Sequence, residues 1–513
     1  MEKGKNILSK LTESFIILII IVFPLCVDST GFFRILECKY RYFLIFNVIY
    51  ISSIIITLSY YWLIKKENLL KDVKLGKIQY ALLAYWLVNV ISTFLSPYFS
   101  KYNLFVGVGR GEGLLNISLY CLSFLNITLF GKFERRYILY FAISSILISF
   151  IATLQYIFWL NPFNMYQDGI GFNNVSFLGT IGNLDFVSAI YCILLTVSMA
   201  GYIFLEDNKT YEKIIYLTSI GLGFFIFEVL DVLSGAVAFG GTLVLVLPFI
   251  LTNSKRLSRA LIAGGLILFG YFATLTINPV YYNYTHQMVH EYQITPYSIA
   301  LFVLTVLFIV LGFVFKKRDF DLSKNTKIIK GFYITLICLG LIILLFLYFV
   351  NLGSGFFYEI HEILHGNFDD DFGTYRIFLW RRSLSIFKEY PIIGTGPDTF
   401  AVRFMAKYTD DIKALGELSI NDTAANNYLT ILVNLGILGL IAYLNFIAFQ
   451  LIFSLKKYNK YNIIFLIAFL CYLIQDFFNL WVVIITPIFW VLMAILSLAT
   501  NYKFTNEGEK ENE

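Results

Sequence analysis

Residues 331–350 read GFYITLICLGLIILLFLYFV, an unbroken apolar run without a charged side chain. A helix needs roughly 20 apolar residues to cross about 30 Å of hydrocarbon, so this run is long enough to span a membrane. Of the 513 residues, 58% are hydrophobic and 14% are charged, whereas soluble domains carry roughly 25% charged residues. Such a chain cannot cover a water-soluble fold with polar side chains, and lipid is therefore its main solvent.

Similar runs recur along the chain and predict an all-α polytopic membrane protein with about 12–14 transmembrane helices. The runs that flank position 233, and those that flank 481, have almost no loop between them, so each pair could be one hairpin or a re-entrant element. An outer-membrane barrel would show short alternating strands instead. The expected spans are 14–33, 43–64, 78–96, 113–131, 137–159, 186–205, 214–232, 234–252, 260–278, 297–315, 329–350, 427–455, 462–480 and 482–500.

The positions of Lys and Arg predict the orientation, because cytoplasmic loops of membrane proteins are enriched in both residues. With the N-terminus inside, basic clusters fall in alternate connecting segments, whereas segments 160–185 and 279–296 contain no Lys or Arg. This alternation indicates that both termini are cytoplasmic, and the first apolar segment is expected to be a retained anchor and not a removed signal peptide. The basic segments are 65–77, 132–136, 209–213, 255–259, 316–330 and 456–460.

The chain is therefore expected to have four parts. Residues 1–350 form an N-terminal region of about eleven transmembrane helices, 351–426 an extracytoplasmic loop, 427–500 the C-terminal transmembrane helices and 501–513 a cytoplasmic tail. The segments predicted to lie outside favour Arg over Lys, and a planar guanidinium binds carboxylate or phosphate through two parallel hydrogen bonds. This bias indicates an anionic ligand on that side, or else salt bridges to Asp and Glu within the same loop. The net charge of +5 is too small to indicate a nucleic-acid partner.

The long loop contains the most distinctive motifs. A stretch from Tyr375 to Tyr390 has helical spacing of apolar residues, ends before Pro391 and predicts an amphipathic helix at the membrane surface. HEILH at 361–365 matches the H-E-x-x-H zinc pattern. Gly366 and Asn367 break the helix directly after it and no third ligand follows, so solvated surface histidines are the favoured interpretation and no metal or cofactor is predicted.

Other polar features lie at the ends of apolar spans. Glu228 and Asp231 are three residues apart, and ionisable groups within a membrane are functional candidates, although both could lie in a turn at the outer interface. GVGRGEGLL at 107–115 places Arg110 and Glu112 on a loop predicted to be outside. Scattered cysteines without ligand spacing are interpreted as small hydrophobic residues. They are Cys26, Cys38, Cys121, Cys192, Cys338 and Cys471.

Together, several motifs resemble the O-antigen ligase and O-antigen polymerase (Wzy-type) family of polytopic membrane glycosyltransferases. They are GRGEGLL at 109–115, GTIGNLDF at 179–186, GTYRIFLWRRSL at 373–384, YPIIGTGPDTF at 390–400 and NDTAANNYLTILVNLGILGL at 421–440. The resemblance implies that glycan is transferred from an undecaprenyl-diphosphate carrier at the outer face of the bacterial cytoplasmic membrane, without metal or nucleotide sugar. It further implies that the diphosphate is bound by Arg110 and Arg376, with Arg381 or Arg403 as further candidates.

One departure from the family pattern affects the catalytic residues. The family has Ala-His-Asn-x-x-Leu before the following helix, whereas this chain has Ala424, Ala425, Asn426, Asn427, Tyr428 and Leu429. Ala425 occupies the place of the histidine and cannot accept a proton. Asn426, Glu112 and Asp422 are therefore the expected catalytic residues, with Asp398, His361 and His365 as other candidates for the missing base. The alternative is an inactive relative that still binds lipid-linked glycan.

The predicted function is the polymerisation or ligation of undecaprenyl-diphosphate-linked glycan units in surface polysaccharide biosynthesis. An acceptor hydroxyl on a glycan, lipid or protein would attack the anomeric carbon with inversion. A lipid-linked glycan transporter or flippase is the main rival, although transporters usually show related halves and no internal repeat is visible here. An intramembrane metalloprotease is the third possibility.

Overall fold

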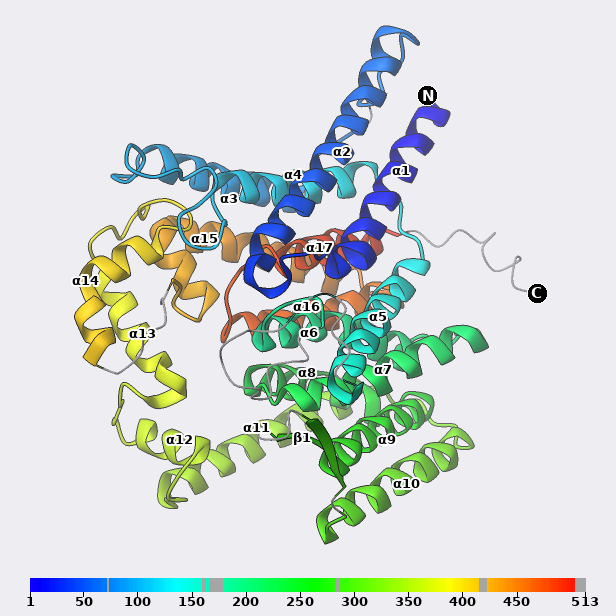
Figure 1. Ribbon diagram of the computed structural model, residues 1–513. Helices are drawn as coiled ribbons and strands as arrows, with labels where there is room; N and C mark the ends of the chain where they lie inside the picture. Colours follow the sequence, from blue (N-terminus) through cyan, green and yellow to red (C-terminus); the bar gives the residue numbers. More distant parts are fainter. Residues whose placement is uncertain are drawn as a thin grey trace.

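The computed structural model describes residues 1–71, 73–158, 163, 165, 179–282, 287–292, 294–414 and 422–502. The fold is nearly all helical (Figure 1). The exception is an antiparallel hairpin of β1 (Ile277–Tyr282) and β2 (Gln287–Tyr292), within a segment that the sequence indicated only as a loop. His286, part of segment 160–185 and nearly all of the predicted tail lie outside the described residues.

Helices fill the chain on both sides of the long loop. In the described part, ten helical spans are long and apolar enough to cross a membrane, and α4, α16 and α17 are shorter apolar helices. The prediction of an all-α polytopic membrane protein is confirmed. The N-terminal helices are α1 (Glu2–Ile17), α2 (Ile35–Leu63), α3 (Lys77–Phe94), α4 (Leu114–Phe130), α5 (Arg136–Phe158), α6 (Leu184–Phe204), α7 (Thr210–Leu230), α8 (Leu233–Leu251), α9 (Ser254–Thr276), α10 (Pro296–Lys316) and α11 (Thr326–Phe349). Those of the loop and C-terminal region are α12 (Phe356–Leu364), α13 (Phe372–Phe387), α14 (Phe400–Ala414), α15 (Asn427–Lys456), α16 (Asn462–Asp476) and α17 (Thr486–Thr500).

The two short connections are turns between separate helices. Asp231 ends α7 in the left-handed region with φ +50°, and α8 begins at Leu233. Glu228 lies in the last turn of α7. The sequence left open whether Glu228 and Asp231 lie within a membrane span or in a turn at its end. The structure places both at the end of α7, next to the turn. Near position 481, α16 ends at Asp476 and α17 begins at Thr486.

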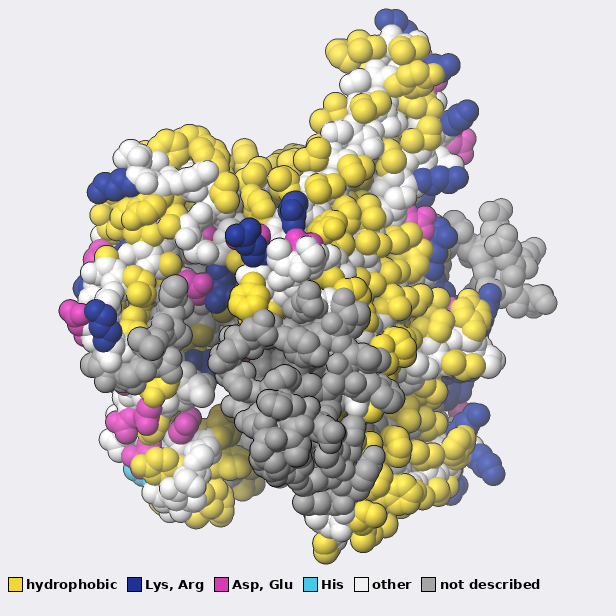
Figure 2. All heavy atoms as spheres, in the orientation of Figure 1, with side chains coloured by type: hydrophobic (Ala, Val, Ile, Leu, Met, Phe, Trp, Pro, Cys, Tyr) yellow, Lys and Arg dark blue, Asp and Glu magenta, His cyan; other side chains and the backbone are white. Residues whose placement is uncertain are grey.

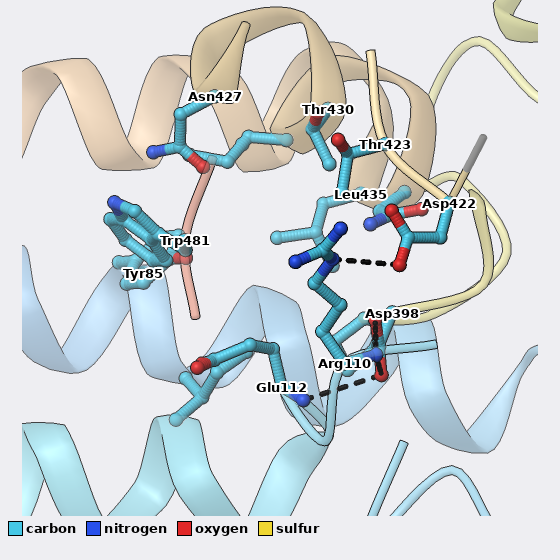
Figure 3. A pocket seen from close by; sticks show the side chains of 14 residues that line it. Tyr85, Arg110, Glu112, Asp398, Asp422, Thr423, Asn427, Thr430, Leu435 and Trp481 are labelled. Carbon is cyan, nitrogen blue, oxygen red and sulfur yellow. Dashed lines mark hydrogen bonds and ion pairs between the residues drawn. The ribbon is translucent and has the colours of Figure 1, made fainter. Parts of the chain in front are cut away.

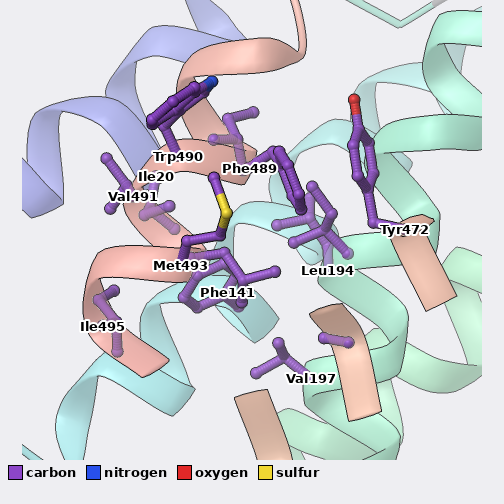
Figure 4. Packing of buried hydrophobic residues seen from close by; sticks show 14 of the residues in the cluster. Ile20, Phe141, Leu194, Val197, Tyr472, Phe489, Trp490, Val491, Met493 and Ile495 are labelled. Carbon is purple, nitrogen blue, oxygen red and sulfur yellow. The ribbon is translucent and has the colours of Figure 1, made fainter. Parts of the chain in front are cut away.

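The core of the bundle lies around α6 and α17. In the most apolar 18-residue stretch of α6, 94% of the stretch is buried inside the protein. In the corresponding stretch of α11, only 6% is buried. Trp490 of α17 stacks on Tyr120 and Phe446, with ring centroids 5.8 Å and 5.7 Å apart. Figure 4 shows Trp490, Phe489 and Met493 interlocking with neighbouring helices. An apolar helix such as α11 can stay exposed on the protein because hydrocarbon is its solvent.

Ion pairs gather several of the basic segments on one face. Arg135, before α5, pairs with Asp207 at 3.0 Å and with Glu212 at 2.8 Å, and Lys460, before α16, reaches Asp207 at 3.0 Å. Lys255 of α9 pairs with Glu206 at 3.3 Å. In Figure 2 dark blue side chains follow the right-hand edge, where α1 and α7 begin and α10 ends in Figure 1. Segments predicted to share the cytoplasmic side thus share a face.

The long loop forms a small helical unit with a core of its own. Phe378 and Ile386 of α13 pack with Phe400 and Phe404 of α14. Arg382 connects several parts of this unit. Its Nη1 lies 2.9 Å from Asp370 and its Nε lies 3.0 Å from Asp411. Its guanidinium stacks on the Phe378 ring, 3.6 Å from the centroid. The predicted amphipathic helix is therefore present, but its apolar face packs on protein instead of the membrane surface. Regular helix begins only at Arg376, since residues 373–375 have positive φ.

The loop unit joins the bundle where α15 is broken. Gly436 has φ +67° and interrupts the helical hydrogen bonds. The freed groups pair with the turn after α13: Ile437 N donates to Pro391 O at 2.8 Å, and Thr395 N and Gly396 N donate to Asn434 O at 2.9 Å and 3.0 Å. Ser92 of α3 donates to Ile393 O at 2.6 Å. Because unpaired backbone groups are costly in a membrane, this pairing fixes the turn.

Labelling of introduced cysteines tests the orientation predicted from charge. In a variant whose native cysteines are replaced, a cysteine at exposed Gly353 is expected to react with an impermeant maleimide in intact cells. A cysteine at exposed Lys456 is expected to react only after the membrane is permeabilised. The opposite pattern would contradict the proposed sidedness.

Candidate active site

A polar pocket lies where the loop unit meets the bundle (Figure 3). It is small, about 50 Å³, which is the room of a few water molecules. A sugar diphosphate would therefore need the lining to open. The lining residues come from α3, the turn before α4, the first turn of α4, the segments on either side of α14, the first half of α15 and the connection before α17. They are Tyr85, Arg110, Glu112, Ile117, Pro397, Asp398, Asp422, Thr423, Asn427, Thr430, Ile431, Asn434, Leu435 and Trp481.

The carboxylate of Asp398 organises the turn before α4. Its Oδ2 accepts hydrogen bonds from the N–H groups of Gly109 and Arg110 at 3.0 Å, Gly111 at 3.1 Å and Glu112 at 3.3 Å. Successive N–H groups that converge in this way form an anion-binding nest. Gly111 supports the convergence with φ +74°. Burial raises the pKa of Asp398 to about 6, against the opposing effect of these N–H groups.

Glu112 is a buried carboxyl group that borders the pocket. Its Oε1 accepts a hydrogen bond from Tyr120 at 2.9 Å, and its Oε2 has no partner among the described residues. Burial raises the pKa of Glu112 to about 8, the hydrogen bond from Tyr120 opposes the rise and the charge of Asp398 adds to it. A carboxyl group that titrates near neutral pH can accept or donate a proton during catalysis.

Arg110 lines the same pocket as Glu112. Its Nε is 2.7 Å from Asp422 Oδ2, and the side chains of the pair are 25% and 17% exposed. Its guanidinium also lies 5.5 Å from the ring centroid of Phe186, in the first turn of α6. Figure 3 shows Arg110 reaching from the turn toward Asp422 and Thr423. In this state a carboxylate of the protein itself therefore neutralises the arginine.

Arg376 does not line this pocket, but it lies near Asp185 in the first turn of α6. Its Nη1 donates to Gly373 O at 2.9 Å and its Nη2 donates to Phe478 O at 3.2 Å. Its Nε is buried without a partner in the described part of the chain. Burial lowers the pKa of Arg376, and the nearby charge of Asp185 opposes this. Since Asp185 precedes Phe186, three sequence motifs converge at the N-terminus of α6.

Arg381 and Arg403 lie elsewhere. Arg381 is 55% exposed, pairs with Asp370 at 3.2 Å and donates to Phe368 O at 2.5 Å. Arg403 is buried, donates to Val433 O at 3.0 Å and also contacts Ile386 O. Neither lines the pocket. For these two arginines the structure favours the alternative of structural contacts within the loop unit.

Asn426 and Ala425 begin α15 beside the pocket. The side chain of Asn426 caps this helix by accepting a hydrogen bond from Leu429 N at 3.0 Å, and it does not line the pocket. Ala425 has φ +47°, a left-handed conformation that alanine adopts at a cost. The neighbouring Asn427 does line the pocket and donates to Asp476 Oδ2 at 2.8 Å.

The two histidines of HEILH lie away from this pocket, on α12. His361 Nδ1 is 2.7 Å from Leu347 O, and His365 stacks on Tyr348 with ring centroids 4.4 Å apart. No group of three or more His, Cys, Asp or Glu side chains that could hold a metal occurs among the described residues. Both histidines thus contact the end of α11.

Sequence reasoning missed several polar residues at or beside the pocket. Asp476 is 1% exposed at the end of α16, and Trp481, which borders the pocket, directs its indole N–H toward the Asp476 carboxyl group. A lone carboxylate in an apolar span was a signal for Asp476. Nothing in the local sequence distinguishes Trp481 or Tyr85 from other aromatic residues of a membrane helix.

The buried position of Arg403 predicts a structural role. Arg403→Met removes donors to buried carbonyl groups and is expected to lower the free energy of unfolding by on the order of 2–4 kcal/mol. Arg381→Met, at an exposed ion pair, is the matched control and is expected to change it by less than about 1 kcal/mol. Thermal unfolding in detergent measures both. Equal stability of the two variants would contradict the assignment.

One comparison with known proteins covers part of this site. A search of curated proteins found no match. The sequence model of a family described as O-antigen ligase matches residues 295–444. This range is less than half of the chain and includes Arg376, Asp398, Asp422 and Ala425, while Arg110 and Glu112 lie outside it. The chain carries an O-antigen ligase domain, which supports its membership in the O-antigen ligase family of membrane enzymes of surface polysaccharide biosynthesis.

Proposed function

We propose that this protein is a glycosyltransferase that moves a glycan from an undecaprenyl-diphosphate carrier to an acceptor hydroxyl at the outer face of the bacterial cytoplasmic membrane. The observation that carries the proposal is the presence of both Arg110 and a buried, titratable Glu112 in the lining of one pocket. Residues within the matched range 295–444 and residues outside it together line that pocket. The transfer builds or attaches surface polysaccharide, on a glycan, lipid or protein acceptor.

The leaving group explains the need for arginine. As the acceptor oxygen bonds to the anomeric carbon, the bond from that carbon to the phosphate oxygen breaks and the diphosphate takes the electron pair. Arg110 and Arg376 would stabilise this developing charge. Asp422 holds Arg110 until the substrate arrives, and the diphosphate would replace its carboxylate. The reaction needs no metal in this scheme.

Glu112 is the group proposed to accept the proton of the attacking hydroxyl. Its Oε2 has no partner in the described part of the chain. The base is the ionised form, so the rate would rise with pH through the pKa of Glu112, which burial raises to about 8. Asn426 acts as a positioning residue, because it fixes the start of α15 beside Asp422. If Glu112 is the base, the presence of alanine at position 425 instead of histidine does not abolish catalysis.

Purified protein with undecaprenyl-diphosphate glycan tests the proposal. Glu112→Gln keeps the shape of the side chain and is expected to lower kcat roughly 10²- to 10⁴-fold, because the base is lost. Arg110→Gln is expected to lower it on the order of 10²-fold or more. Chain extension on the carrier is the readout.

Arg381→Gln is the control, since this exposed arginine is bound to other residues of the loop unit. It should leave kcat near that of the unaltered protein. Transfer that survives in Glu112→Gln would exclude Glu112 as the base, and an inactive unaltered protein that binds the carrier would indicate the inactive relative.

Restoring the family histidine gives a second test. The left-handed backbone at residue 425 tolerates histidine better than most side chains. Ala425→His is expected to restore transfer at least tenfold in the Glu112→Gln background, because an imidazole can serve as base. The pH dependence should then follow the imidazole. No gain in this background would argue against a base at position 425.

A further inference from the structure

We propose that Asp398 is a positioning residue that holds Arg110 and Glu112 in their working geometry. This inference rests on the proposed function for its effect on catalysis. The positioning itself follows from contacts between two segments that are far apart in the sequence: the turn of residues 109–112 and the end of the PIIGTGPDTF segment.

The first argument is geometric. The N–H groups of Gly109, Arg110, Gly111 and Glu112 all donate to the Asp398 carboxylate at 3.0–3.3 Å. Two of these residues, Arg110 and Glu112, line the pocket. A single side chain therefore fixes the backbone from which both functional groups project. Without it, these N–H groups, of which only that of Glu112 belongs to a buried residue, would lose their shared acceptor, and the turn would lose its shape.

The second argument is that the turn is built for this carboxylate. A side chain at Gly109 would bring its Cβ to 3.0 Å from Asp398 Oδ1, which is tighter than ordinary contact. Asp398 itself is held firmly, because Thr399 Oγ1 donates to Gly396 O at 2.7 Å and Gly396 N donates to Asn434 O at 3.0 Å. A series of hydrogen bonds thus connects the break in α15, through residues 396–399, to the turn before α4.

The third argument is electrostatic. Several ionisable groups surround Glu112: Tyr120 of α4, Tyr40 of α2, Tyr85 of α3, Tyr472 of α16, Arg110 and Asp422 of the pocket, and Asp398. After burial, the charge of Asp398 is what raises the pKa of Glu112, while the Tyr120 hydrogen bond lowers it. Removing that charge should lower the pKa of Glu112, so its base form would appear at lower pH.

The substitution Asp398→Asn tests both effects in the full-length protein. Infrared difference spectra over a pH titration follow the carboxyl band of Glu112, which is assigned by its loss in Glu112→Gln. We expect the midpoint of this band to move to lower pH in Asp398→Asn, with kcat lowered on the order of 10²-fold and the pH profile of the residual rate moved in the same direction. Asp410→Asn is the control, because Asp410 is 99% exposed at the end of α14.

A second variant covers the case in which Asp398→Asn does not fold. Gly109→Ala adds a methyl group against the carboxylate but keeps its charge, and Gly109 does not have a positive φ. It is expected to lower kcat on the order of tenfold while the Glu112 midpoint stays near that of the unaltered protein.

The outcomes separate the two proposals. An unmoved Glu112 midpoint and unaltered kcat in Asp398→Asn, or full activity in Gly109→Ala, would overturn the positioning role. A shifted midpoint in a protein that transfers no glycan would support the contact between Asp398 and Glu112 and would reject the proposed transferase.

Discussion

The hydrogen bonds between the Asp398 carboxylate and the N–H groups of residues 109–112 are the interaction on which the site depends. A buried carboxylate is tolerated only where donors surround it, and buried N–H groups are tolerated only where an acceptor meets them. Each side satisfies the other here. These hydrogen bonds therefore hold the loop unit against the bundle beside the pocket that Arg110, Glu112 and Asp422 line.

The membrane environment explains why the turn 391–396 pairs with α15 at the break in that helix. Within hydrocarbon, a kink such as that at Gly436 leaves backbone groups that water cannot satisfy. The turn 391–396 supplies partners for them: Pro391 O and Ile392 O accept hydrogen bonds from α15, and the N–H groups of Thr395 and Gly396 donate to Asn434 O. Backbone pairing therefore fixes the turn, the turn fixes Asp398, and Asp398 fixes the segment that carries Arg110 and Glu112. The pocket forms at the end of this chain of contacts.

The sequence predicted the features that depend on composition and local pattern. Apolar run length gave the helical membrane fold, and the GRGEG turn and the loop motifs identified Arg110, Arg376 and Asp422. The family resemblance placed Arg376 before Arg381 and Arg403, but no local pattern explains that order. Only packing shows that Arg403 is buried against carbonyl groups. The role of Asp398 escaped prediction for the same reason: its partners lie almost 300 positions away, at 109–112. The hairpin of β1 and β2 was missed because its residues follow an apolar span and were interpreted as part of a loop.

The most direct test of the central claim is an experimental structure of the protein in lipid with an undecaprenyl-diphosphate glycan bound. The account predicts that the diphosphate lies against Arg110 at the start of α6, in place of the Asp422 carboxylate, while the contacts between Asp398 and residues 109–112 persist. A diphosphate bound elsewhere, with the ion pair between Arg110 and Asp422 intact, would contradict it.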